Sequence, residues 1–131
     1  MAAALASSSC AWLRYEDQIR THVELMERIA ADAGSAVQGA GYRLRPADLQ
    51  TMAYPLERAA ALRKRIESNR VDPALRAAFG DFVGAYSQLY EYLDQVRSTA
   101  DEPRLSERVD ELLAGVDRAA GRVRAALGAG G

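Results

Sequence analysis

Four stretches of this chain place an apolar residue at every third or fourth position, and this spacing restricts the fold more than any other feature. In the clearest stretch, residues 75–96, steps of four and three alternate without a break. Its apolar positions are Leu75, Phe79, Phe82, Tyr86, Leu89, Leu93 and Val96. On an α-helix these side chains share one face, whereas a strand would divide them between two faces. The spacing therefore predicts a long amphipathic helix.

The same spacing recurs in three further stretches, with end signals beside them. These stretches cover residues 12–33, 49–66 and 105–123. We interpret Gly34 as the C-terminal stop of the first. Pro46 suits the first turn of the second helix. Asp72 and Pro73 form a cap and a first turn for the helix that contains residues 75–96.

A period near 3.5 residues over several heptads is typical of helices that pack at shallow crossing angles. The connections around Asn69 and Thr99 are short, so successive helices should run antiparallel. We therefore predict an all-α fold, an antiparallel up-and-down four-helix bundle over residues 12–127. Residues 1–11 form a flexible or signal-like lead, and residues 128–131 a disordered tail. The helix of residues 75–96 is expected at the centre.

Pro55 interrupts the second predicted helix. Proline lacks the backbone donor and crowds the preceding turn, so it bends or breaks a helix. Because the apolar spacing continues on both sides of Pro55, we predict a kink near residues 53–54. The alternative is a short helix over residues 46–53 followed by a longer one.

Composition excludes several classes of protein. With 131 residues, 49% of them hydrophobic, the chain can bury a core without metals or disulfides. The single cysteine, Cys10, excludes an internal disulfide. No apolar run approaches the roughly 20 residues of a membrane-spanning helix.

The groups that could carry catalysis or bind a metal lack the neighbours they would need. His22 is the only histidine, and Ile19 stands where a Glu-x-x-His metal motif needs its glutamate. The glycine-rich segment 34–41 has no following Lys-Ser/Thr for a phosphate, so it is interpreted as an interhelical loop. The sequence therefore predicts no enzyme, no cofactor and no metal, although a cofactor-holding bundle stays as the least supported alternative.

Two surfaces are candidates for a partner. The basic residues Arg58, Arg63, Lys64 and Arg65 lie in the second predicted helix and could meet phosphates or an acidic partner. Alternatively, they offset the dipole at the end of that helix. Consecutive basic residues point about 100° apart and form no stripe, and the net charge is −1; both facts disfavour nucleic acid.

Tyr90 and Tyr92 flank the apolar face of residues 75–96 and widen it. A helix with a broad apolar arc either lies at the centre of a bundle or offers an outward face to a partner. Tyrosine suits both positions, since it buries a ring and keeps a polar tip. Both tyrosines are therefore candidate partner residues, with a central position in the core as the alternative.

The first ten residues, Met-Ala-Ala-Ala-Leu-Ala-Ser-Ser-Ser-Cys, resemble the last part of a bacterial lipoprotein signal peptide. In such peptides small residues precede a cysteine that becomes lipidated, and the resemblance implies lipidation at Cys10. Ser7 stands where an aliphatic residue is expected, and no Lys or Arg precedes the apolar part. The alternative is an Ala/Ser-rich lead into the first helix, capped by Ser9.

The sequence thus favours a non-catalytic helical bundle that acts through protein–protein contact or self-association, as an adaptor, scaffold or accessory subunit. The alternative is an envelope lipoprotein anchored through Cys10, in which case a membrane is met only through the lipid. The sequence leaves localisation open between the cytoplasm and the envelope.

Overall fold

The computed structural model of the protein consists of four α-helices, which confirms the predicted all-α class. They are α1 (Ala2–Gln38), α2 (Pro46–Glu67), α3 (Pro73–Val96) and α4 (Leu105–Ala129). The structure describes the backbone of residues 2–38, 45–67, 71–96 and 104–129, with side chains from residue 15 to residue 128. The predicted connections at Asn69 and Thr99, and residues 39–41 of the glycine-rich segment, lie outside the described residues.

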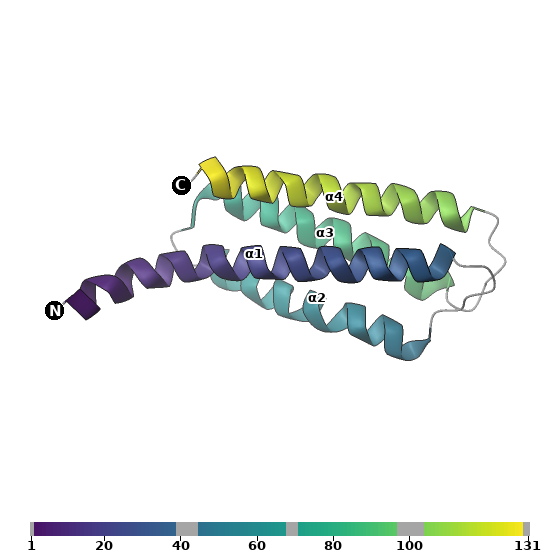
Figure 1. Cartoon of the computed structure of the whole chain (residues 1–131), viewed down its shortest axis with the longest axis horizontal. Coiled ribbons are helices and arrows are strands. Elements are labelled where there is room, and N and C mark those ends of the chain that lie inside the picture. The colour runs from purple at the N-terminus through teal and green to yellow at the C-terminus, as the bar shows by residue number, and fades with distance from the viewer. Residues whose placement is uncertain (1, 39–44, 68–70, 97–103, 130–131) are drawn as a thin grey trace.

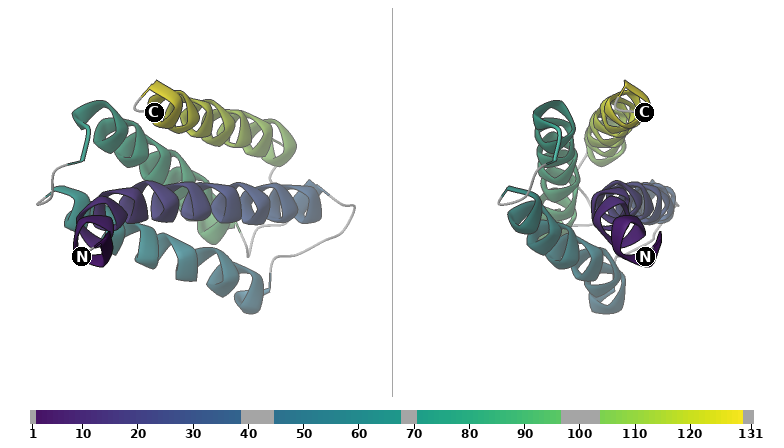
Figure 2. Two further views of the ribbon diagram at one scale, coloured as in Figure 1. Left: turned by 60° about the vertical axis from the view of Figure 1, so that its left-hand side comes forward. Right: turned by 90° about the vertical axis from the view of Figure 1, so that its left-hand side faces the viewer.

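The helices form a bundle in which each runs opposite to the one before it (Figure 1). Both α1 and α3 pack against all three other helices. The remaining pair, α2 and α4, occupies opposite corners, as the end view in Figure 2 shows, and their described residues make no contact. The central position expected for residues 75–96 therefore belongs to α3 and is shared with α1.

The apolar stripe of α3 supplies the middle of the core. All seven stripe residues predicted for α3 are buried, from Leu75 to Val96. The main stripe positions of α4 are buried as well: Val109, Leu112, Val116, Ala119 and Val123. Burial of one large apolar side chain contributes about 1.5–3 kcal/mol. Because no charged or polar residue is buried within the described part of the chain, this burial is the main source of stability.

Gly34 does not end the first helix, as the sequence had predicted, but lies inside α1 and faces α4. It is buried, and the helix continues for one more turn to Gln38. A methyl group at this position would come within 2.5 Å of Leu113 Cδ1 and 3.4 Å of Val109 Cγ1. The missing side chain therefore lets α1 and α4 approach closely, which is a packing role and not a capping role.

Exposed polar contacts join α1 to α4 at both ends of their shared interface. Gln38 donates to Asp110 Oδ1 over 2.6 Å, and Arg124 forms an ion pair with Glu27. Arg122 of α4 also lies 3.8 Å from Asp81 of α3. Exposed pairs of this kind contribute about 0–1 kcal/mol each to stability. The burial of apolar side chains therefore holds the helices together, and the polar pairs help to orient them.

Pro55 lies within a single continuous α2 and is buried. The second helix is therefore not divided into two at the proline, and the kink near residues 53–54 stays a prediction.

At the N-terminus, α1 begins at Ala2, so residues 2–11 of the predicted lead continue its backbone. These first turns extend beyond the ends of the other three helices (Figure 1). Within the described residues, none of the helices combines the length and hydropathy needed to cross a bilayer.

Replacement of Gly34 by isoleucine should lower the free energy of unfolding by about 1–3 kcal/mol, because a branched side chain overpacks the α1–α4 contact. Urea denaturation measures the change. Gly121 is the matched control: it lies on α4 with open space around it, so Gly121→Ala should raise the stability by about 0.5–1 kcal/mol through helix propensity. An unchanged or increased stability of Gly34→Ile would show that the close approach is not required.

Candidate functional site

The two tyrosines predicted to meet a partner are half-buried on the flanks of α3. Tyr90 and Tyr92 both pack against the core cluster. The Tyr92 ring centroid lies 6.0 Å from Arg108 Cζ of α4, where the guanidinium faces the aromatic ring. Much of each ring therefore takes part in the bundle itself, and the surface left for a partner at these positions is small.

The predicted basic residues are exposed along α2, but they do not form one patch. Arg63 reaches toward α3, where its Nε would lie 3.2 Å from a methyl group placed on Gly80. It also lies 4.0 Å from Glu67, in a shallow depression between α2 and α3. Arg58 instead faces α1. Arg63 lies beside Gly80, about three turns of α3 before Tyr92, so the structure does not bring Arg63 next to Tyr92.

A different surface, between α1 and α2, carries the exposed apolar side chains. Among the described residues, the large hydrophobic side chains classed as exposed are Leu25 and Tyr54, with 43% and 61% of their surface accessible. Both line the same depression of about 240 Å³. Its walls are Thr21, His22, Leu25, Tyr54, Pro55 and Arg58. Two isolated apolar residues would need no explanation, but two that meet across a depression form one exposed apolar surface, which makes it a candidate site for a partner.

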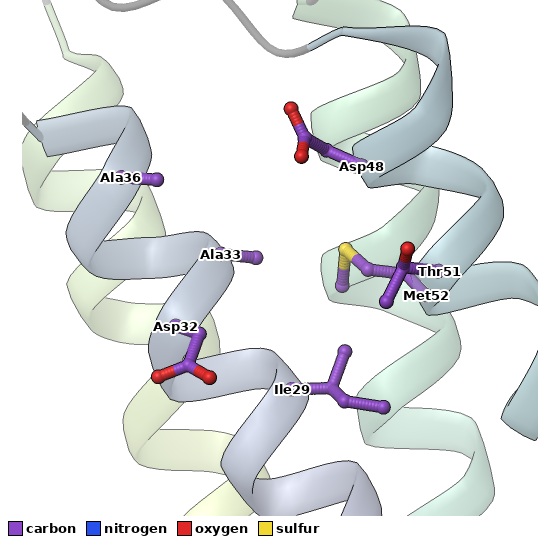
Figure 3. Close-up of a pocket in the computed structure, with 7 residues that line it drawn as sticks. All are labelled: Ile29, Asp32, Ala33, Ala36, Asp48, Thr51 and Met52. Atoms are coloured by element: carbon purple, nitrogen blue, oxygen red, sulfur yellow. The ribbon is translucent and has the colours of Figure 1, made fainter.

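A second depression of about 270 Å³ continues along the same two helices. Its residues are Ile29, Asp32, Ala33 and Ala36 from α1, and Asp48, Thr51 and Met52 from α2. Figure 3 shows Ile29, Ala33 and Ala36 pointing toward α2, with the Asp32 carboxylate beside them on α1. The space exists because the alanines of α1 have short side chains. It also exists because α2 separates from α1 toward Pro46 (Figures 1 and 2). The residues of the two depressions together are called the α1–α2 groove below.

Charge is distributed unequally along the α1–α2 groove. Asp32 and Asp48 lie at one end, and His22 and Arg58 lie at the other. Leu25, Ile29, Ala33, Met52 and Pro55 form the apolar surface between these ends. The groove thus combines an apolar floor with one end that holds two carboxylates, of which Asp48 is paired with Arg45, and a second end that holds a guanidinium and an imidazole.

Local contacts hold the charged groups of the groove in place. The Arg58 guanidinium lies 5.5 Å from the Tyr54 ring centroid and donates to the Tyr54 hydroxyl over 3.0 Å. Asp48 accepts a bond from the backbone N–H of Arg45 over 3.0 Å, a capping contact at the start of α2. Its carboxylate also forms an ion pair with the Arg45 guanidinium, with 3.3 Å between Oδ2 and Nε. His22 donates from Nδ1 to the Gln18 carbonyl over 2.7 Å, which leaves Nε2 as its second polar atom.

A metal site would require several ligating side chains that converge on one point. In the part of the chain with described side chains, no three His, Cys, Asp or Glu residues converge on a metal position. His22, the histidine without a metal-binding partner in the sequence, is half-buried at the rim of the groove and has no carboxylate among the residues that line its depression. An apolar floor between opposite charges suits the amphipathic surface of another helix.

The sequence contains one indication of this groove, which is a pair of apolar residues that lie outside the apolar stripes of their helices. Leu25 is an apolar residue on the otherwise polar side of the first predicted helix, next to the stripe residue Met26, and Tyr54 stands outside the stripe of the second. Their meeting requires the pairing of α1 with α2, which the sequence alone does not specify.

Comparison of the chain with protein-family models, curated proteins and solved structures gives no match. The choice of the α1–α2 groove as the candidate site therefore rests on its geometry alone.

Tyr86 fixes α2 beneath the groove. Its buried hydroxyl donates to the Met52 carbonyl over 2.8 Å, one turn before Pro55. Burial, with a smaller effect from Tyr90, raises the pKa of the Tyr86 phenol far above its usual range. The phenol therefore stays neutral in the folded protein and keeps its bond to α2 across the whole neutral and mildly alkaline range.

Tyr86→Phe removes this bond and should lower the free energy of unfolding by about 1 kcal/mol at neutral pH. The unfolded chain ionises its tyrosines near pH 10. The stability that the neutral Tyr86 contributes is therefore fully present below about pH 10 and is lost as the pH rises above it. Denaturant titrations across this range should show a steeper alkaline loss in the wild type than in Tyr86→Phe. The exposed Tyr54→Phe control should keep the steep loss, and identical slopes in all three proteins would contradict the assignment.

Proposed function

We propose that this protein is a non-catalytic helical-bundle module that acts through protein–protein contact, as an adaptor, scaffold or accessory subunit. Its contact surface is the α1–α2 groove, and the partner presents an amphipathic helical surface. The observation that carries the proposal is the meeting of the exposed Leu25 and Tyr54 in one apolar depression. No cofactor and no nucleic acid has a role in this function.

The physical reason is the cost of leaving this surface in water. Burial of apolar surface contributes about 25 cal/mol per Å², and an aromatic residue near a cation is a frequent centre of protein interfaces. Tyr54 with Arg58 has this arrangement. A partner helix that covers Leu25, Tyr54 and Pro55 would gain this energy without unfolding any part of the bundle.

The α1–α2 groove contains only one of the partner residues predicted from the sequence. Arg58 belongs to both the predicted surface and the groove. Tyr90 and Tyr92 already pack against the core, and Arg63 leans toward α3. These residues are therefore expected to stabilise the bundle, and the partner is expected to meet α1 and α2.

A photo-crosslinking amino acid placed at Thr21 tests this surface in the native cells. Crosslinked species should form from Thr21 and should be lost when Tyr54→Glu is added, because a charge in the apolar depression opposes docking. Tyr54 is exposed, so the change should alter the free energy of unfolding by about 0.5 kcal/mol or less, which thermal unfolding measures.

Ala114 provides the matched control, since it is exposed on α4 and lies outside the groove. The same crosslinker at Ala114 should give no such species, and Ala114→Glu should leave the Thr21 products unchanged. Equal crosslinking from both positions, or none from Thr21, would remove the proposal.

A second candidate function is that of a bacterial envelope lipoprotein anchored through Cys10. The observation that favours it is the extension of the first turns of α1 beyond the other helices (Figure 1). The described core begins at Ile19, so processing before Cys10 would remove none of its residues. The bundle would then stand on a lipid-bearing helix, with the α1–α2 groove still open to a partner.

Intact-mass measurement of the protein from its native membranes and cytosol tests the anchor. A chain that begins at Cys10 and carries additional lipid mass is the expected result, and Cys10→Ser should leave the chain unprocessed. A native chain that retains residues 2–9 and has no added mass would exclude this candidate.

A further inference from the structure

We infer that the partner of the α1–α2 groove is the same groove of a second copy of this chain, related by a two-fold axis that crosses the groove. The inference rests on the proposed function, since it names the occupant of the same surface. It is carried by the charge pattern of the groove, which is complementary to itself when one copy is reversed.

The acidic and basic side chains of the two helices are matched in position. On α1, His22 and Asp32 are ten residues apart, and on α2, Asp48 and Arg58 are also ten residues apart. In a helix this separation is about 15 Å. Because α1 and α2 run in opposite directions (Figure 1), the two bases share one end and the two acids share the other.

Two arrangements could bring two such grooves face to face with two-fold symmetry. If the axis runs along the groove, each basic end meets the basic end of the second copy, and each acidic end meets the acidic end. If the axis runs across the groove, both helices are reversed and every end meets its opposite. Like charges in contact are disfavoured, so the axis across the groove is selected.

In this arrangement the contacts are isologous, which means that each residue pair occurs twice. α1 lies antiparallel on α1 of the second copy, and α2 on its α2. Arg58 then faces Asp48 of the second copy, and His22 faces Asp32. The same reversal places Leu25 of one copy over Ile29 of the other, and Tyr54 near Met52, so the apolar residues of the floor also meet.

The size of the surface indicates a weak dimer. Residues 21–36 of α1 span about 22 Å, and two adjacent helices are about 20 Å wide. The resulting contact of about 450 Å² in projection is smaller than the roughly 800 Å² per partner of a standard stable interface. The dimer should therefore dissociate on dilution, and high salt should weaken it because charge pairs select its geometry.

Sedimentation velocity of the full chain from micromolar to millimolar concentration tests the inference. The 14.2 kDa chain should approach twice its mass as concentration rises, and the Kd should increase with salt. Arg58→Glu and Asp48→Lys should each raise the Kd about tenfold or more, because each homodimer then contains two like-charge contacts.

An equimolar mixture of Arg58→Glu and Asp48→Lys gives the decisive measurement. In a mixed dimer related by the proposed axis, the new Glu faces the new Lys, and the native Arg58 faces the native Asp48. The mixture should therefore dimerise with a Kd close to that of the wild type, although neither variant does so alone. Recovery also shows that both variants are folded, which matters because Asp48 caps α2.

Arg118→Glu is the matched control, since Arg118 is exposed on α4 and lies outside the groove, and it should leave the Kd unchanged. A wild type that stays monomeric at millimolar concentration, or a mixture that stays monomeric, would overturn the inference. If the chain is monomeric but Thr21 still crosslinks to a different protein, the self-association fails while the proposed function stands. If Thr21 gives no crosslinks either, both fail.

Discussion

The bundle depends on the burial of one continuous apolar stripe on α3. Each of the other helices lays its own apolar residues against that stripe, and α2 has no contact with α4 in the described part of the chain. Only α3 and α1 therefore hold these two helices in one domain. Apolar burial has no direction of its own, so the buried hydrogen bond from Tyr86 to the Met52 carbonyl also sets how α2 sits on α3.

The α1–α2 groove exists because α1 packs more closely against α4 than against α2. On one side Gly34 allows α4 to come close, with Leu113 filling the space that a side chain would occupy. On the other side Ala33 and Ala36 face α2 across an open depression, and α2 turns away toward Pro46 (Figure 3). Close packing on one side and separation on the other leave the apolar residues between α1 and α2 in contact with solvent.

The sequence predicted the helices because their apolar spacing is a local property, and the stripe of α3 was identified completely. Gly34 was misinterpreted because a glycine at the end of an apolar pattern can end a helix or admit a neighbouring one, and only the neighbour distinguishes the two. The groove was not predicted for a similar reason. Leu25 and Tyr54 are far apart in the sequence, and each alone is an ordinary exposed residue. Tyr90 and Tyr92 were candidates for a partner surface because they widen the apolar arc of α3. The same broad arc is also expected for residues that pack against the core, and both tyrosines occupy such a half-buried position.

The pairing of α1 with α4 has a consequence for the order in which this chain can fold. The Gln38–Asp110 and Glu27–Arg124 contacts join residues that are 72 and 97 positions apart, and α4 is synthesised after α1, α2 and α3. While the ribosome is still making it, α1 to α3 are present with the stripes that α4 will cover still exposed to solvent. Such partly covered intermediates are the species that chaperones bind and that aggregate. The nascent bundle therefore gains its native core only when α4 leaves the ribosome, and a chain cut short within α4 would be left with an open bundle.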